Sequence, residues 1–322
     1  MYFQISDIRD VVFQEPLPDW AKDGVMSASP FKEGEQWRLV GRGFTAAEPV
    51  TFSRLFLADG VNPFEFTIRP EPLLSPRPSG SIDELGVEDP TVIERPHFGR
   101  SIFYSQVRRK PAEEHPGSDA LGVYVSLGFL FQMEPHADRW AAREYHNQHT
   151  ILEPTEQQWW EHPLDMCKEG EILLRESEET DVLFYEFADG ERSRIAAADT
   201  NLSTMGRVVT WNSRLWLDRR PDMWDSDHVS TGPIVRLGDK CLMLYNGRSA
   251  KRIWSIGEVV FDQGTLAIEY RSEEPLIVPP KEIGWKNQYI AFSSGALVDG
   301  NTIYLYHHIA DRRIRCAVGT LK

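Results

Sequence analysis

The feature of this sequence that most constrains its fold is a triplet of strands that recurs five times. Each triplet opens with a strand entered through small, polar or acidic residues, continues with an apolar or aromatic strand and ends with a third strand. The triplets recur at roughly 60–80 residues, which is longer than the ~40–50 residues of common propeller repeats and requires elaborated loops. The opening strands are GVMSASPF (24–31), GVEDPTVIE (86–94), CKEGEILLRE (167–176), HVSTGPIVRL (228–237) and FSSGALVDG (292–300).

One triplet is too small to bury both of its faces, whereas five triplets stacked radially would share one core. The pattern therefore predicts an all-β protein, a five-bladed β-propeller that forms a single domain over residues 1–322. A β-sandwich is the alternative, but it would not need five similar units. We expect little helix. The exception is an insertion in blade two, residues 137–162, which is predicted to hold a loop and a turn or two of helix.

The composition of the chain indicates which binding partners and which cellular compartment to expect. Of the 322 residues, 41% are hydrophobic and 11% aromatic, enough for a sizeable core, and the net charge is −14. A chain this acidic is not expected to bind nucleic acid or an anionic membrane surface, because phosphate groups require a basic face. No apolar run reaches the ~18–20 residues of a membrane span, and the first ten residues lack the form of a signal peptide. Cys167, Cys241 and Cys316 lack disulfide-type or zinc-type spacing, so we expect buried thiols in a cytoplasmic protein without metal or cofactor.

The entry residues of the opening strands predict a functional site. In a propeller the first strand of each blade lines the central channel, so the five entries would meet on one face. They would bring together Ser27, Ser29, Glu88, Asp89, Lys168, Glu169, Ser230, Thr231, Ser293 and Ser294. Adjacent carboxylates before Pro90 are unusual, because acidic residues are depleted in strands and proline is confined to strand starts and edges. A solvated loop would also explain that pair, but five polar entries favour a site.

Three motifs in these strands resemble a known family. GVEDPTV (86–92) resembles the family motif G-x-E-D-P-R, with Thr91 in place of the arginine. Residues 224–247, WDSDHVSTGPIVRLGDKCLMLYNG, resemble its W-[DE]-S…G-P-P-P-I…Y-H-G segment. Residues 292–321, FSSGALVDGNTIYLYHHIADRRIRCAVGTL, resemble its F-P-x-G…Y-Y-G-A-A-D-x-x-I-x-x-A ending. In this order the motifs resemble those of glycoside hydrolase family 130, the β-mannoside phosphorylases and β-1,2-mannosidases, which implies a five-bladed propeller over most of residues 24–321.

The departures from the family pattern bear on the attacking group. Phosphorolysis favours several Arg and Lys donors for phosphate. Lys168 and Arg42 resemble basic residues of the family, but Asn246 replaces the histidine of Y-H-G and a blade-three arginine is absent. We therefore predict an inverting glycoside hydrolase acting on β-mannoside-like oligosaccharides. The alternatives are a phosphorylase of the same family that uses inorganic phosphate and a non-catalytic carbohydrate-binding propeller; a homo-oligomer is left open.

Glycoside cleavage requires an acid for the leaving oxygen and, in an inverting hydrolase, a base for water roughly 6.5–9.5 Å away. Asp89 is the predicted acid, because Glu88 beside it and partial burial would raise its proton affinity. The resemblance implies that this aspartate delivers its proton through a sugar hydroxyl. Glu169 and Glu186 are the predicted bases, with Glu169 preferred at its strand entrance. Predicted substrate-binding residues are Arg42, Arg54, Asp59, Glu88, Tyr104, Lys168, Asp225, His228, Asn246 and Asp311.

Several of these residues have a simpler interpretation. Asp59 and Asp311 resemble sugar-contacting positions of the family but also suit turns. Arg54 is equally compatible with a surface ion pair, and Glu186 with an outward position on a mid-blade strand. Asp225, with its neighbour Asp227, is an alternative base in the fourth triplet.

Overall fold

A computed structural model describes residues 1–45, 52–95, 99–111, 122–131, 148–175, 180–190, 192–202, 209–282, 284 and 287–322. Strands dominate these residues, and none of them lies in an α-helix. The predicted all-β class is therefore confirmed. The part of the predicted insertion that the structure describes holds a strand and one 3-10 turn, Pro154–Glu156, while residues 137–147 lie outside the described residues. Within the described ranges no helix is long and apolar enough to cross a membrane.

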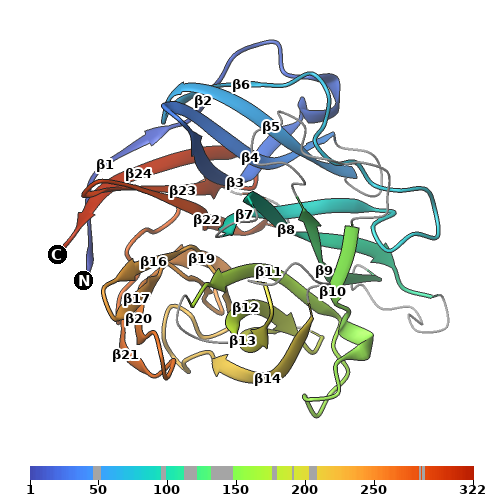
Figure 1. The fold of residues 1–322 in the computed structure, drawn as a ribbon, viewed down its shortest axis with the longest axis vertical. Coiled ribbons are helices and arrows are strands. Elements are labelled where there is room, and N and C mark those ends of the chain that lie inside the picture. The colour runs from blue at the N-terminus through green and yellow to red at the C-terminus, as the bar shows by residue number, and fades with distance from the viewer. Residues whose placement is uncertain are drawn as a thin grey trace.

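The strands form five consecutive antiparallel groups (Figure 1). The first three groups match the predicted triplets and add a fourth, outer strand to each. Group one is β3 (Gly24–Glu33), β4 (Gln36–Thr45), β5 (Phe52–Asn62) and β6 (Glu65–Ile68). Group two is β7 (Gly86–Arg95), β8 (Gly99–Arg109), β9 (Val123–Phe131) and β10 (Gln148–Leu152). Group three is β11 (Met166–Leu173), β12 (Asp181–Ala188), β13 (Ser193–Thr200) and β14 (Thr210–Leu217).

The fourth group differs from the prediction because each of its three predicted strands, residues 228–237, 240–248 and 252–262, is broken in two. Its inner half is β15 (His228–Ser230), β18 (Asn246–Arg248) and β19 (Ile253–Ile256), and its outer half is β16 (Ile234–Leu237), β17 (Lys240–Met243), β20 (Val259–Asp262) and β21 (Ile268–Arg271). The first break lies at Gly232 and Pro233. A Cβ on Gly232 would lie 1.9 Å from the carbonyl oxygen of Leu244, so only glycine allows the two backbones to approach this closely.

The fifth group joins the two ends of the sequence. It contains β22 (Tyr289–Asp299), β23 (Thr302–Ile309) and β24 (Arg313–Leu321), and its fourth strand is β1 (Phe3–Asp10), which pairs antiparallel with β24. A short strand after β1, β2 (Val12–Phe13), pairs with β6 of group one. The start of the chain therefore holds groups five and one together.

Apolar side chains fill the spaces between groups. Separate buried clusters join groups one and two, two and three, three and four, and four and five, and a further cluster joins group five to group one. Phe103 and Phe187, for example, lie in the cluster between groups two and three. The first strands face one another, since β3 contacts both β7 and β22, and β7 contacts β11 (Figure 1). This arrangement brings the predicted entry residues together.

Candidate active site

Three first strands carry the same irregularity at their entrance. In each of them two residues oppose a single residue of the second strand, which is a β-bulge. The first residue of each pair has a positive φ: 51° at Ser27, 48° at Asp89 and 52° at Glu169. This left-handed conformation costs an L-residue roughly 1–2 kcal/mol, so its repetition points to a shared device that turns one side chain out of the strand. The opposed residues are Gly41, Tyr104 and Tyr185.

The three redirected side chains meet. The hydroxyl of Ser27 donates a hydrogen bond of 2.8 Å to Oδ1 of Asp89. The carboxyl groups of Asp89 and Glu169 lie within hydrogen-bonding reach of each other, and both are largely buried. Because a hydrogen bond between two carboxyl groups requires a proton, the pair holds one proton at the pH where the bond exists.

Two cations and two further carboxylates surround this pair. Arg42 contacts Oε1 of Glu88 at 2.6 Å and Oδ1 of Asp89 at 3.5 Å, and the hydroxyl of Ser53 donates to the same oxygen of Glu88 at 2.7 Å. Lys168 lies 3.5 Å from Oε1 of Glu169 and 3.8 Å from Oε2 of Glu186. The site therefore contains Arg42 and Lys168 against Glu88, Asp89, Glu169 and Glu186.

The proton affinities are the reverse of the expectation from sequence. Burial raises the pKa of Asp89, but the charges of Arg42 and Lys168 and the hydrogen bonds from Ser27 and Glu169 bring it down to about 2. Burial and the negative charge of Asp89 raise the pKa of Glu169 well above its ordinary value. Glu88 does not have the predicted effect on Asp89 because Arg42 and Ser53 bind its carboxylate. Glu169 is thus the protonated member of the pair.

Asp89 and Glu169 are also too close together to act as the predicted acid and base. A base that activates water for inversion stands roughly 6.5–9.5 Å from the acid, whereas the carboxyl group of Glu169 lies within hydrogen-bonding reach of Asp89. Glu186 is buried beyond Lys168, and its Oε2 has no hydrogen-bond partner among the described residues. The geometry therefore transfers the candidate role of base from Glu169 to Glu186.

A histidine that the sequence reading missed links Asp311 to the pair. Nδ1 of His308 accepts a hydrogen bond of 3.4 Å from the backbone N–H of Ser27, and its Nε2 lies 3.2 Å from Oδ1 of Asp311. The ring of Phe292 stacks on His308 with 5.3 Å between centroids. A proton on Nε2 satisfies both contacts, so a neutral His308 connects Asp311 to the strand that carries Ser27. The signal in the sequence is the polar pair that ends the otherwise apolar YLYHH.

A further carboxyl lies two residues beyond Glu169 on β11. Glu171 is buried and accepts a hydrogen bond of 3.4 Å from the hydroxyl of Thr91, the residue that stands where the family motif has arginine. Burial raises the pKa of Glu171 to about 8. Among the described residues no three His, Cys, Asp or Glu side chains are placed to hold a metal ion.

Two predicted binding residues lie away from this cluster. Asp59 pairs with Arg38 and Arg69, and Arg38 is four residues along β4 from Arg42, or roughly 13 Å at about 3.3 Å per residue. Asp59 therefore forms ion pairs within group one, away from the cluster around Arg42. Arg54 follows Ser53 on β5, and the alternation of side chains along a strand directs it to the opposite face.

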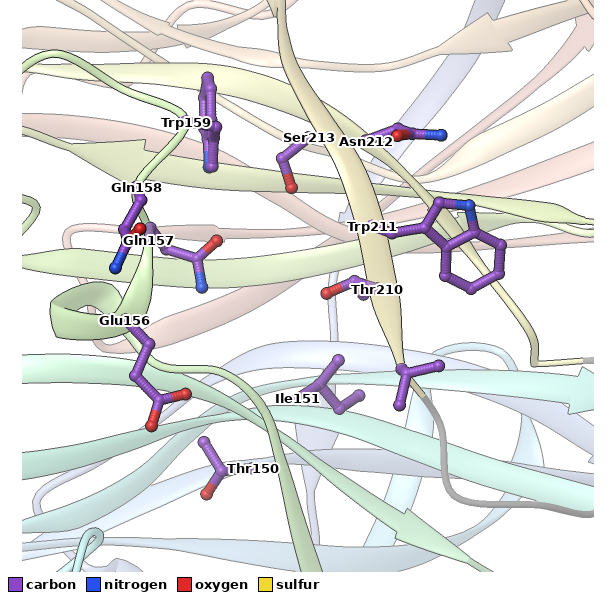
Figure 2. Close-up of a pocket in the computed structure, with 11 residues that line it drawn as sticks. Thr150, Ile151, Glu156, Gln157, Gln158, Trp159, Thr210, Trp211, Asn212 and Ser213 are labelled. Atoms are coloured by element: carbon purple, nitrogen blue, oxygen red, sulfur yellow. The ribbon is translucent and has the colours of Figure 1, made fainter.

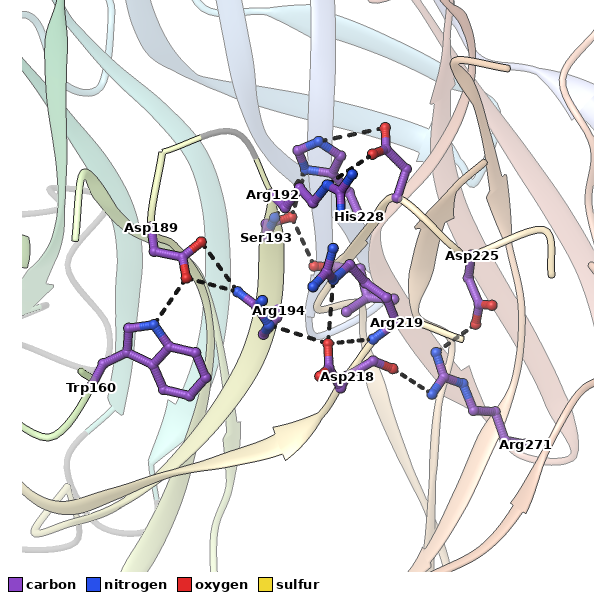
Figure 3. Close-up of polar contacts among 12 residues, drawn as sticks. Trp160, Asp189, Arg192, Ser193, Arg194, Asp218, Arg219, Asp225, His228 and Arg271 are labelled. Atoms are coloured by element: carbon purple, nitrogen blue, oxygen red, sulfur yellow. Dashed lines mark hydrogen bonds and ion pairs between the residues drawn. The ribbon is translucent and has the colours of Figure 1, made fainter. Parts of the chain in front are cut away.

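Two other predicted binding residues are buried and already make internal hydrogen bonds. Tyr104 is fully buried in the core, where its hydroxyl accepts a hydrogen bond from Gln106. The carboxylate of Asp225 is also fully buried. Its hydrogen-bond donors are Arg220, Arg271 and the hydroxyl of Tyr245. Figure 3 shows the contact with Arg271. None of these groups is free to contact a sugar, which corrects the prediction for Tyr104 and Asp225.

Asn246 has a structural role of the same kind. Its amide donates to the carbonyl oxygens of Thr231 and Ser293 at 2.6 and 3.1 Å, and its Oδ1 accepts from the backbone N–H of Ser293 at 2.7 Å. The side chain thus binds the entrance of group four to the first strand of group five. Asn246 supports the site and does not line it, which corrects its prediction as a substrate-binding residue.

His228 remains a candidate ligand-binding residue. Its Nδ1 accepts a hydrogen bond of 3.1 Å from the backbone N–H of Ser193, so the proton of the neutral ring is on Nε2 (Figure 3). That nitrogen is buried without a hydrogen-bond partner in the described part of the chain. Burial and the neighbouring charge of Arg248 lower the pKa of His228 to about 3. The residue can therefore donate one hydrogen bond but supplies no positive charge at neutral pH.

Comparison with known proteins relates the chain to enzymes of carbohydrate metabolism. The model of glycoside hydrolase family 130, described as beta-1,4-mannooligosaccharide phosphorylase, matches residues 128–322. A 1,2-beta-oligomannan phosphorylase from Thermoanaerobacter sp. (strain X514) is 28% identical over 119 residues, which are 33% of this chain and 40% of that protein. The chain thus aligns with less than half of this relative.

Solved structures show a likeness over nearly the whole chain. The beta-1,2-mannobiose phosphorylase from Listeria innocua, in complex with β-1,2-mannobiose, aligns with a TM-score of 0.68 at 14% identity, covering 92% of this chain and 89% of that one. The alpha-L-arabinofuranosidase from Lactobacillus brevis aligns with a TM-score of 0.62 at 12% identity, covering 94% and 96%. At these identities the likeness is one of fold.

Proposed function

Because this chain belongs to glycoside hydrolase family 130, we propose that it is an inverting glycosidase that hydrolyses β-mannoside-like oligosaccharides. Residues 1–322 form one domain in this proposal, a five-bladed propeller whose first strands surround the site. The apolar clusters between successive groups, with a fifth cluster between groups five and one, support the ring. The pairing of β1 with β24 completes the last blade.

The Asp89–Glu169 pair supplies the acid. Its single proton passes to the leaving oxygen, directly or through a sugar hydroxyl, as the bond from that oxygen to the anomeric carbon breaks. Arg42, Ser27 and Lys168 hold the remaining negative charge on the pair. A proton shared between two carboxyls suits this step, because such pairs retain one proton at pH values where an isolated carboxyl is ionised.

Glu186 is the proposed base. A water molecule on the opposite side of the sugar ring bonds to the anomeric carbon and loses its proton to Glu186, whose Oε2 makes no hydrogen bond in the described structure. Lys168 lies between Glu186 and Glu169, so its charge stabilises whichever carboxyl is ionised. Burial disfavours the charge of Lys168, but Glu186 and Glu169 outweigh this and raise its pKa.

The charge balance is the observation that favours water over phosphate. Four carboxyl groups surround two cations, and the pair's one proton leaves at least three negative charges. A phosphate dianion would meet this negative site without the charge of a protonated histidine, since His228 is neutral and Asn246 is committed elsewhere. Each missing charged hydrogen bond is worth roughly 1.5–3 kcal/mol, or about tenfold or more in affinity.

Product analysis tests this proposal. The purified protein is incubated with β-1,2- and β-1,4-linked mannobiose, each with and without inorganic phosphate. Free sugar at a rate independent of phosphate is expected. Sugar 1-phosphate as the main product would overturn hydrolysis and make the protein a phosphorylase, as the relatives described above are named. Binding without any turnover across a panel of β-linked oligosaccharides would leave a non-catalytic carbohydrate-binding protein.

A further inference from the structure

A second cavity lies between groups two and three, on their outer side. It has a volume of about 370 Å³ and is bounded by the segment that follows β10 and by the first half of β14. Figure 2 shows Thr210 and Ser213 projecting from β14 toward the segment that carries Gln157 and Trp159. The volume falls in the range of roughly 300–1,000 Å³ typical of small-molecule sites.

This cavity is distinct from the reaction centre. In the sheet order β13 separates β14, which lines the cavity, from β12, which carries Glu186, so these two strands lie roughly 10 Å apart at about 4.8 Å per strand. Trp159 packs on Phe187 of β12, and the alternation of side chains along β12 places Phe187 on the opposite face from Glu186. The cavity therefore lies on the other face of β12 from the carboxyl group of Glu186.

Polar groups at the base of the cavity have incomplete hydrogen bonding. Nε1 of Trp159 is buried and has no hydrogen-bond partner among the described residues, and the same is true of the hydroxyl of Tyr185. The Tyr185 hydroxyl lies next to Trp159 and Ser213, both of which line the cavity, but not in hydrogen-bonding geometry. Buried donors normally find a partner, so a molecule in the cavity would complete their hydrogen bonds.

The indole of Trp159 is held in place for this role. Its ring packs edge-on against Phe187 at 5.0 Å and against Trp160 at 5.6 Å between centroids. A fixed aromatic side chain with a free N–H presents an apolar surface and a directed donor at once. A saccharide has both complementary features, since its ring carbons are apolar and its hydroxyls accept and donate.

The other side chains around the cavity agree with a neutral, hydroxyl-rich ligand. Gln157, Gln158 and Asn212 offer amides, Thr210 and Ser213 offer hydroxyls, and Glu156 offers a carboxylate. Among the described residues no Lys or Arg lines the cavity. Without a cation the cavity does not suit phosphate or a carboxylate. We infer that this cavity is a second saccharide-binding site, separate from the reaction centre, with the indole N–H of Trp159 as its central donor. That the bound sugar is a mannoside rests on the proposed function.

The indole signal of Trp159 provides a direct test. Asp89→Asn in the full chain slows turnover by about 10²–10⁴-fold. The Trp159 indole peak is assigned in a ¹H–¹⁵N spectrum by its loss in Trp159→Phe. We expect this peak to shift saturably with β-1,2- or β-1,4-mannobiose but not with glycerol at the same hydroxyl concentration. The matched control is Trp216, whose Nε1 already donates to the carbonyl oxygen of Leu266 and should not shift. A Trp159 signal that does not move with any of these sugars overturns the proposal.

A substitution that fills the cavity provides a second test. Ser213→Phe places a ring on an outer strand that tolerates aromatic residues, and should weaken the mannobiose dependence of the Trp159 shift at least about tenfold. With Asp89 intact it should leave turnover within about twofold. If Ser213→Phe does not fold, Thr210→Val is used instead, because it removes a hydroxyl from the cavity without adding volume. Unchanged affinity in the folded variant shows that the sugar binds elsewhere. A Trp159 shift in a protein without hydrolase activity would sustain the cavity while refuting the proposed function.

Discussion

The carboxyl groups of Asp89 and Glu169 lie within hydrogen-bonding reach of each other although they come from the first strands of different groups. Each reaches the other because a bulge with positive φ turns its side chain out of the strand. The contact makes the two carboxyls one acid–base unit, with the proton on Glu169 and the charge on Asp89. The function of either residue therefore depends on the other.

Replacing the two carboxyls tests whether they act as one unit. General acid catalysis contributes about 10²–10⁴-fold, so Asp89→Asn and Glu169→Gln should each reduce kcat/KM by that amount. If they share one proton, the double variant should be little worse than either single variant, because residues that act together are not additive. The melting temperatures of the single variants check that the fold is retained. Multiplying losses in the double variant would contradict a shared proton.

The pH dependence of the rate tests where the proton resides. The raised pKa of Glu169 means that the acid form persists into the range where a free glutamate is ionised, and that activity is lost as pH rises through that pKa. In Glu169→Gln the proton donor must be Asp89, whose low pKa leaves it ionised at neutral pH. We expect the alkaline limb of the kcat/KM profile to disappear and the residual rate to rise toward acid pH. An unchanged profile would assign the limb to another group.

Much of this architecture is predictable from the sequence, because the polar entries and apolar second strands recur five times. The third triplet, predicted at 167–176, 181–187 and 193–202, corresponds to β11, β12 and β13 within a few residues. A fourth strand was expected in each blade but could not be placed, because these outer strands are exposed edges with little alternation: in β14, TWNSRLWL, most residues are partly or fully exposed. The breaks in group four depend on close backbone approaches such as that at Gly232, which only the packed structure reveals.

The candidate site was predictable as a place but not as a set of contacts. Polar residues at strand entrances marked Asp89 and Glu169, but a left-handed backbone at aspartate or glutamate has no local sequence signal, since glycine and asparagine are the residues expected there. The residue type alone does not tell whether a polar side chain faces a ligand or forms hydrogen bonds with the protein backbone. Asn246 is of the second kind, and His308, which joins the site, reads as part of an ordinary strand.

Asn246→Ala tests the structural role of this amide. The change leaves the backbone N–H of Ser293 and the carbonyl oxygen of Thr231 without these partners in a buried region. Leaving buried groups unpaired costs about 1–3 kcal/mol, so the free energy of unfolding in denaturant should fall by that amount. Asn301→Ala, at an exposed asparagine in the turn between β22 and β23, is the control and should change it by less than about 0.5 kcal/mol. Equal effects of the two variants would contradict the assignment.

Glu171 gives stability a pH dependence that can be isolated. Its folded pKa of about 8 lies above the 4.5 of the free side chain, so the stabilisation is complete below about pH 4.5 and is lost as pH rises through about 8. At 1.36 kcal/mol per pKa unit this amounts to roughly 5 kcal/mol. Glu171→Gln should flatten the decline in unfolding free energy between pH 5 and 8. A decline of the same slope in the variant would show that Glu171 is ionised in the folded protein.

Glu258 of group four should hold the first strand of the chain in place. Its buried carboxylate accepts hydrogen bonds from the backbone N–H groups of Tyr2 at 3.0 Å and Phe3 at 2.6 Å, just where β1 begins. Hydrogen bonds to a charged group contribute about 1.5–3 kcal/mol, and Glu258→Gln replaces one acceptor oxygen by a donor that faces an N–H. We expect faster amide hydrogen exchange over β1 than in the wild type, with little change in β12. Asp7→Asn, which breaks only an exposed pair with Arg9 on β1, is the matched control and should leave exchange unchanged. Because β1 completes group five, loosening confined to β1 would show that this contact fastens the last group, whereas unchanged protection would show that pairing with β24 alone is sufficient.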